Sequence, residues 1–171
     1  MKFSSLKLAR MGVVAGLYIV LSLFTFPVAS GAIQFRISEG LTLLPLIFPE
    51  TAVGLFIGCI FANLITGCAL VDIFVGAFIT LFACVLTAII GMFIKNKPLK
   101  ILLGGLFPVI MNAFLLPLIW WFCYGRLDYV YMLQVAFLLA GQALSVYVIG
   151  TPTYLFCDRA KRKGYRGFTD N

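Results

Sequence analysis

The side chains that could do chemistry form a short set in an otherwise apolar chain. Nine of them could contact a small polar molecule: Gln34, Arg36, Glu39, Asn63, Asp72, Asn112, Trp120, Trp121 and Gln134. Carboxylates, amides and a guanidinium group recognise donors and acceptors by hydrogen bonding, and an indole ring can stack on a planar ligand. These residue types therefore predict a site that binds a small polar molecule.

Asp72 is the most informative of these residues, because it begins a long apolar segment. A carboxylate inside a bilayer costs about 2.5–3.5 kcal/mol on insertion scales and is usually functional. Small residues share one helix face with it: Gly76, Thr80, Ala83, Thr87 and Gly91. Such a face packs against other helices, so we expect Asp72 to point into the protein and contact a ligand. The alternative is that it caps its helix, because aspartate is favoured at N-caps.

The other candidates each have a structural alternative. Glu39 could serve the site or complement a helix dipole as a first-turn acid, and Arg36 could pair with Glu39 or with a lipid headgroup. Trp120 and Trp121 could anchor the chain at a membrane interface. Adjacent helical residues point about 100° apart, so at most one of the two readily faces the bundle centre. We interpret Glu50 as structural.

Nothing in the sequence indicates catalysis. The chain has no histidine, no Ser/His/Asp set and no Walker loop, and its five cysteines form no C-x-x-C pair. Metal and haem sites need such ligands at defined spacings, so we expect no metal, no cofactor and no enzyme. The cysteines are interpreted as small apolar residues inside helices.

The elements that position these residues must be membrane helices. Of 171 residues, 63% are hydrophobic and only 11% are charged, and the mean hydropathy is +1.09. A soluble domain carries roughly 25% charged residues, so a soluble enzyme is excluded. The abundance of aromatic residues excludes disorder. The net charge of +7 does not indicate nucleic acid, because the basic residues border apolar runs instead of forming a module of their own.

The apolar runs predict an all-α bundle of six transmembrane helices in a single domain, 1–171. The expected helices cover about 8–29, 38–48, 49–66, 70–94, 101–123 and 130–157. The second is exceptional, because about 11 residues give only about 16 Å of helix, too little to cross the bilayer. It also contains Pro45. We expect it to be short or kinked and held inside the protein by its neighbours.

The basic residues predict the orientation. Eleven of the thirteen fall in three clusters: Lys2, Lys7, Arg10; Lys95, Lys97, Lys100; and Arg159, Lys161, Arg162, Lys163, Arg166. Six helices place all three clusters on one side, with Arg36 and Arg126 on the other. The positive-inside rule then makes both termini cytoplasmic. The hydrogen-bonding side chains gather in the outer half, so the site should open to the outside.

Two stripes of small residues predict close helix contacts. One consists of Gly54, Gly58 and Ala62, and we expect it to pack internally. The other consists of Gly12, Ala15 and Gly16 in the first helix. That stripe could also pack internally, or it could present a docking surface to a second membrane protein.

Three motifs together carry a resemblance to a known family. They are Q-F-R-I-S-E-G-L-T-L-L-P over 34–45, G-L-F-I-G-C-I-F-A-N-L over 54–64 and D-I-F-V-G over 72–76. In this order they resemble the QueT family, the queuosine-precursor S components of energy-coupling factor (ECF) transporters. The resemblance implies a prokaryotic plasma-membrane protein that docks, through its first helix, onto a transmembrane coupling protein and two cytoplasmic ATPases.

The resemblance also implies a ligand, a 7-deazaguanine such as preQ1, preQ0 or queuine. Glu39 and Asp72 would accept hydrogen bonds from the base edge and from a cationic aminomethyl group. Asn63 and Gln34 would read its acceptor oxygen, and one tryptophan would cover its face. Two alternatives remain at this point: an S component for a different vitamin-like nutrient, and a small stand-alone permease or channel.

Overall fold

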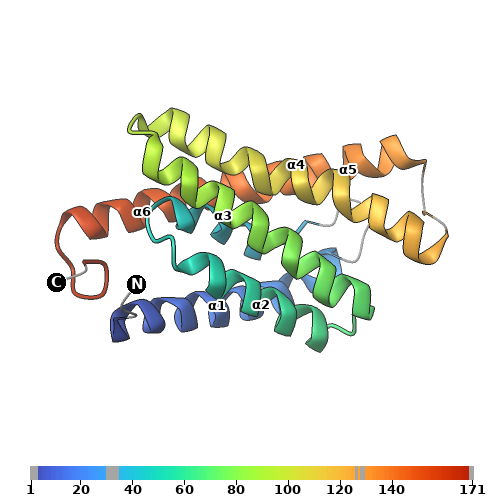
Figure 1. Cartoon of the computed structure of the whole chain (residues 1–171), viewed down its shortest axis with the longest axis horizontal. Helices are drawn as coiled ribbons and strands as arrows, with labels where there is room; N and C mark the ends of the chain where they lie inside the picture. Colours follow the sequence, from blue (N-terminus) through green and yellow to red (C-terminus); the bar gives the residue numbers. More distant parts are fainter. Residues whose placement is uncertain (1–3, 30–34, 126, 128–129, 170–171) are drawn as a thin grey trace.

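The computed structural model describes residues 4–29, 35–125, 127 and 130–169, and every regular element in these ranges is helical. The order is α1 (Ser5–Ala29), η1 (Ile37–Leu46), α2 (Thr51–Ile65), η2 (Asp72–Gly76), α3 (Ala77–Phe93), α4 (Lys97–Tyr124), α5 (Tyr131–Ala143), η3 (Leu144–Ile149) and α6 (Gly150–Arg162). The helices run roughly along one long axis (Figure 1). The prediction of an all-α protein is confirmed.

Four helical stretches are long and apolar enough to cross a membrane: Ser5–Phe26, Asp72–Phe93, Lys97–Tyr124 and Tyr131–Arg162. The remaining two, η1 and α2, are shorter apolar helices. Fifteen residues give α2 a length of about 22 Å, less than the roughly 30 Å of a hydrocarbon core. The number of membrane spans therefore stays a prediction, although the chain forms the expected six helical stretches.

The two helix ends that differ most from the expected boundaries do so for local reasons. α4 begins at Lys97 instead of 101, because the side chain of Asn96 accepts the Leu99 N–H and Pro98 occupies the first turn. α6 continues to Arg162 instead of ending near 157, and its last turn is basic. Cations there complement the negative end of the helix dipole.

α1 begins and α6 ends at the same end of the bundle (Figure 1), which we call the terminal end. The basic side chains of these two helix ends lie there, in keeping with the expected topology; the membrane side that this end faces stays a prediction. Glu50, interpreted as structural, pairs with Arg10 at 2.9 Å at this end, and both side chains are buried.

The second helix is short, as predicted, and it lies inside the bundle. η1 is a 3-10 helix whose residues from Ser38 to Leu46 are all buried, including Pro45. At about 2.0 Å per residue, its ten residues cover about 20 Å, roughly half the length of the 28-residue α4 at about 1.5 Å per residue. Its last residue, Leu46, packs directly against the backbone of α3, where a Cβ on Gly91 would lie 2.6 Å from the Leu46 carbonyl oxygen.

α1 and α2 approach each other through the glycine stripe of α2, as predicted. A Cβ on Gly54 would lie 2.5 Å from the Met11 carbonyl oxygen, and one on Gly58 would lie 3.0 Å from that of Ala15. Ala15 is therefore buried in this contact. It does not share the exposed face of α1 with Gly12 and Gly16, where an added Cβ would meet nothing within 4 Å. The expected docking surface is reduced to these two glycines.

The small-residue face of α3 points inward, as its spacing predicts. Ala83 and Thr87 are buried, and the Thr87 hydroxyl lies 2.8 Å from the Gly104 carbonyl oxygen of α4, to which it donates. Farther from the terminal end, Gly76 and Thr80 line an open space between the helices. One face of a single helix thus passes from tight packing to a cavity.

Candidate functional site

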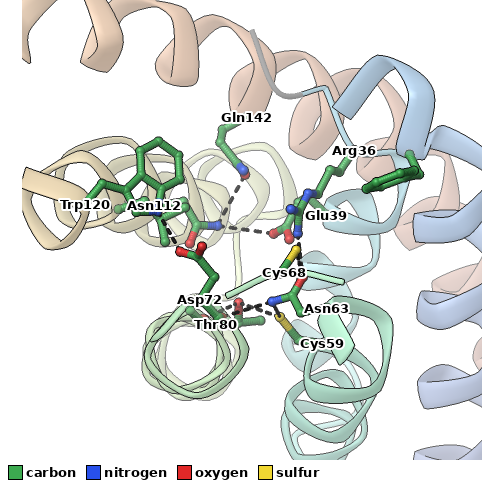
Figure 2. Close-up of a pocket in the computed structure, with 13 residues that line it drawn as sticks. Arg36, Glu39, Cys59, Asn63, Cys68, Asp72, Thr80, Asn112, Trp120 and Gln142 are labelled. Atoms are coloured by element: carbon green, nitrogen blue, oxygen red, sulfur yellow. Dashed lines mark hydrogen bonds between the residues drawn. The ribbon is translucent and has the colours of Figure 1, made fainter. Parts of the chain in front are cut away.

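A cavity of about 190 Å³ lies beyond the first turn of η1, in the half of the bundle away from the terminal end. Its described lining is Phe26, Arg36, Glu39, Cys59, Asn63, Cys68, Asp72, Gly76, Thr80, Asn112, Leu116, Trp120 and Gln142. These residues come from α1, α2, α3, α4 and α5, from η1 and η2, and from the segments that precede η1 and η2. Figure 2 shows their polar side chains directed toward a common space.

Glu39 is the most deeply buried acid of the cavity, with 3% of its surface exposed. The first turn of η1 places it there. One carboxylate oxygen accepts from the Tyr18 hydroxyl at 2.5 Å, and the other accepts from Asn112 Nδ2 at 3.3 Å. The same Asn112 nitrogen also donates to Gln142 Oε1, at 3.4 Å. A buried carboxylate requires such partners, so this network holds Glu39 at the base of the cavity.

Arg36 and Asn63 form the next part of the wall. Arg36 Nη1 donates to Asn63 Oδ1 at 3.0 Å, and Asn63 Nδ2 donates to the Asp72 carbonyl oxygen at 3.1 Å. Arg36 also lies close enough to Glu39 for mutual attraction. The arginine therefore faces the protein interior through Asn63 and Glu39, and not a lipid headgroup.

Asp72 and Trp120 face each other on the wall of the cavity opposite to Arg36 and Glu39 (Figure 2). Trp120 Nε1 donates to Asp72 Oδ1 at 2.6 Å. Leu70 and Val71 are already helical, so Asp72 lies within the first turn and not at the N-cap position that the capping alternative requires. The residue opens a π-helical turn, η2, a local distortion that is frequent at functional sites. The indole thus fixes one carboxylate oxygen of Asp72 and leaves the group at the cavity wall.

A comparison with known proteins identifies the family of the chain. The profile described as "QueT transporter" matches residues 8–159, most of the chain. The chain belongs to the QueT transporter family. No curated protein and no solved structure matches it significantly.

Membership of the QueT family confirms the resemblance carried by the three motifs, which all lie within the matched residues. QueT proteins are the queuosine-precursor S components of ECF transporters. This QueT family member is therefore a membrane transport protein. All three motifs also contribute lining residues to the cavity: Arg36 and Glu39 from the first, Asn63 from the second and Asp72 from the third.

The structure brings together most of the predicted site residues of this QueT family member. The cavity is lined by Arg36, Glu39, Asn63, Asp72, Asn112 and Trp120. Trp121 points away, with 54% of its surface exposed. Gln134 is buried without lining the cavity, and its Oε1 has no partner among the described residues. Gln34 lies outside the described residues.

The cavity and supporting residues that were not predicted include four with a polar or sulfur-containing side chain: Tyr18, Cys59, Thr80 and Gln142. Gln142 carried a usable signal, since it lies two turns after Gln134 on one helix and is polar in an apolar segment. The only sign in the sequence that Tyr18 could belong to a site is its hydroxyl group. That sign is weak, because tyrosines are common throughout apolar helices. Cys59 and Thr80 are small residues whose sequence positions suit helix packing equally well.

The charges of the cavity favour a ligand that donates hydrogen bonds and carries positive charge. Two carboxylates, Glu39 and Asp72, face one guanidinium group, that of Arg36. No group of three or more metal-ligating side chains occurs among residues 4–29, 35–125, 127 and 130–169. The arrangement can therefore bind and orient a polar organic molecule through carboxylates, amides and an indole.

Proposed function

We propose that this chain is a substrate-binding S component that captures the 7-deazaguanine preQ1 in the polar cavity. The observation that carries the proposal is the placement of two carboxylates, Glu39 and Asp72, on different walls of one cavity. A guanine-type edge offers an N1–H and an exocyclic amine, which one carboxylate accepts together. The cationic aminomethyl group of preQ1 requires a second acid.

The division of roles follows from the surroundings of each acid. Asp72 stands beside Trp120, whose ring can cover a flat base, so we assign Asp72 to the base edge. Glu39 lies deeper, and both of its hydrogen-bond donors, Tyr18 and Asn112, are neutral, so we assign it to the aminomethyl cation. Arg36 donates to the acceptor oxygen of the base in this arrangement.

The size of the cavity supports a small member of the ligand class. Drug-sized ligands occupy clefts of about 300–1,000 Å³, whereas this cavity measures about 190 Å³. A bicyclic base suits that volume better than queuine, which carries an additional ring. The two carboxylates favour preQ1 over preQ0, because a nitrile has no positive charge and donates no hydrogen bond.

Delivery would use the partners that S components dock onto: a transmembrane coupling protein and two cytoplasmic ATPases. The exposed strip at Gly12 and Gly16 supports this step, because small residues let another helix approach closely. The close packing of η1 against Gly91 disfavours a stand-alone permease. Uptake of preQ1 by cells that contain this protein should therefore appear only when the coupling module is co-expressed.

The test of the site compares carboxylate variants by isothermal titration. Asp72→Asn should weaken binding of both preQ1 and guanine by about 10- to 150-fold, because hydrogen bonds to charged groups contribute about 1.5–3 kcal/mol. Glu39→Gln should weaken preQ1 binding comparably and leave guanine binding nearly unchanged, because guanine lacks the aminomethyl cation. Asp158→Asn, at the terminal end, is the matched control and should bind both ligands normally.

Two results would contradict the proposal. Unchanged preQ1 affinity in both Asp72→Asn and Glu39→Gln, with normal thermal stability, would place the ligand elsewhere. Tighter binding of queuine than of preQ1 would show that the cavity expands well beyond its present volume and would reject the size argument.

A further inference from the structure

A second cavity lies at the terminal end, on the side of η1 opposite to the polar cavity. It has a volume of about 330 Å³ and is bounded by the end of η1 and by α3, α4 and α6. Lys100, Lys161 and Asp158 contribute its charged side chains. It shares no lining residue with the polar cavity, so the inference below does not depend on the function proposed above.

The two lysines are held at this cavity by neutral groups. Lys100 Nζ donates to the Gly91 carbonyl oxygen at 2.8 Å, and Lys161 Nζ donates to the Ile47 carbonyl oxygen at 3.2 Å. A carbonyl fixes an ammonium group without neutralising its charge. The two ammonium groups also lie close enough to repel each other. An anion between them would relieve this repulsion.

The single acid of the described lining does not balance these charges. Asp158 already forms ion pairs with two other cations, Lys97 at 2.6 Å and Arg162 at 3.1 Å. The cluster therefore contains four basic side chains and one carboxylate, and it is strongly positive. Lys97 and Arg162 share that carboxylate, whereas Lys100 and Lys161 line the open volume with only carbonyl oxygens and the Phe48 ring as their described contacts at hydrogen-bond or cation–π distance.

The rim of the cavity indicates which anion it receives. Met92 lines the cavity and is 65% exposed, and the adjacent Phe93 is 78% exposed. In a membrane protein, exposed apolar side chains at a helix end contact lipid tails. A positive cavity that opens beside such a surface matches the basic pockets between membrane helices that receive anionic headgroups.

We propose that this cavity binds a phosphate group between Lys100 and Lys161, carried by the headgroup of an anionic lipid. The same chemistry would accept inorganic phosphate, and the apolar rim favours the lipid. A bound headgroup would join η1, α4 and α6 at the terminal end and would stabilise their packing.

The test uses the full chain in nanodiscs of phosphatidylcholine, with phosphatidylglycerol or inorganic phosphate added in separate arms. Phosphatidylglycerol should raise the unfolding temperature of the wild type, whereas inorganic phosphate at equal concentration should not. The double variant Lys100→Gln/Lys161→Gln should lose roughly 30-fold in apparent affinity for phosphatidylglycerol, at about 1 kcal/mol for each lysine near a membrane surface. Lys100→Arg/Lys161→Arg should retain most of it.

The matched control is Lys95→Gln/Lys163→Gln, which removes the same charge from two exposed lysines at the same end. An equal loss of affinity in this control would indicate general surface attraction and overturn the site. Stabilisation by inorganic phosphate that matches that of the lipid would support the phosphate site and reject the lipid as its source. If neither anion stabilises the wild type, the proposal fails.

Asp158→Asn offers a test of opposite sign that does not remove either lysine. Loss of the one acid in the described lining should strengthen phosphatidylglycerol binding several-fold. Weaker binding in this variant, with unchanged stability in phosphatidylcholine alone, would show that Asp158 belongs to the ligand contact and would overturn an anion site.

Discussion

The two halves of the bundle interior differ in what occupies the axis. Toward the terminal end, the axis holds η1, and its backbone touches its neighbours so closely that a Cβ on Gly91 would lie 2.6 Å from the Leu46 carbonyl oxygen. In the other half, the axis holds the polar cavity. A Cβ on Gly76, on the same helix face as Gly91, would find its nearest neighbours at 3.8 Å.

This difference explains why the second helix is short. A full-length helix on the axis would fill the space that the cavity occupies. Because η1 begins beside the cavity and continues toward the terminal end, its closely packed backbone forms the floor of the cavity, with Glu39 in its first turn. The packed half thereby fixes the position of an acid that the cavity half needs, and it separates the cavity from the terminal end.

The largest effect is expected from a single methyl group in the packed half. Gly91→Ala must displace the backbone of Leu46, because its Cβ would approach three backbone atoms of that residue at 2.6–3.0 Å. Overpacking of this kind costs about 1–3 kcal/mol, more than the roughly 1 kcal/mol that alanine gains over glycine in helix propensity. The thermal unfolding temperature in detergent should fall.

Gly12→Ala is the matched control for this substitution. It adds the same methyl group to a helical glycine with nothing within 4 Å, so the protein should be as stable as the wild type or slightly more stable. Equal stability of Gly91→Ala and Gly12→Ala would show that the packing around Gly91 adapts to an added methyl group as easily as an open surface does, and would remove the basis of the comparison.

A smaller effect, confined to ligand affinity, is expected when one of the two adjacent tryptophans is replaced. Trp120→Phe removes the hydrogen bond to Asp72, measured at 2.6 Å, and part of the ring at the cavity wall. The affinity for preQ1 should fall about tenfold, equivalent to about 1.4 kcal/mol. Trp121→Phe should leave it unchanged, because Trp121 faces outward. Equal losses in the two variants would contradict the orientation of this helix.

The contrast between these tryptophans also shows where prediction from the sequence ends. Spacing predicts that at most one of two adjacent residues faces inward, but it does not say which one. The choice depends on the rotation of α4, which is set by contacts such as that between Thr87 and the Gly104 carbonyl group. Those contacts join residues that are distant in the sequence, so they emerge only from the folded packing.

The sequence predicts best the features that depend on one segment alone. The apolar runs indicate the helices, the length of the second run indicates that it cannot span, and the spacing of small residues indicates that Asp72 points inward. In contrast, local patterns predicted Ala15 on the docking surface and Gln134 in the binding site, and the structure places neither residue there. Ala15 packs against Gly58, and Gln134 is buried outside the lining of the cavity.

The smallest effect is expected in the cavity half. Gly76→Ala adds a methyl group that would stand 3.8 Å from both Asn63 Nδ2 and Leu116 Cδ2, ordinary contact distances. The free energy of unfolding should therefore stay within about 0.5 kcal/mol of the wild-type value, as for other substitutions that create no clash. The added methyl group projects toward the ligand space, so preQ1 affinity should fall only a few-fold.

The pair Gly76→Ala and Gly91→Ala makes this last prediction decisive, because both substitutions lie on one face of one helical stretch and change the same atoms. Calorimetric unfolding and preQ1 titration should distinguish the two variants. Gly76→Ala should lose preQ1 affinity and keep its unfolding temperature, whereas the main effect of Gly91→Ala should be a lower unfolding temperature. If Gly76→Ala unfolds as early as Gly91→Ala, the cavity half is packed as tightly as the terminal half. The space between Glu39 and Asp72 would then be too small for a bicyclic base.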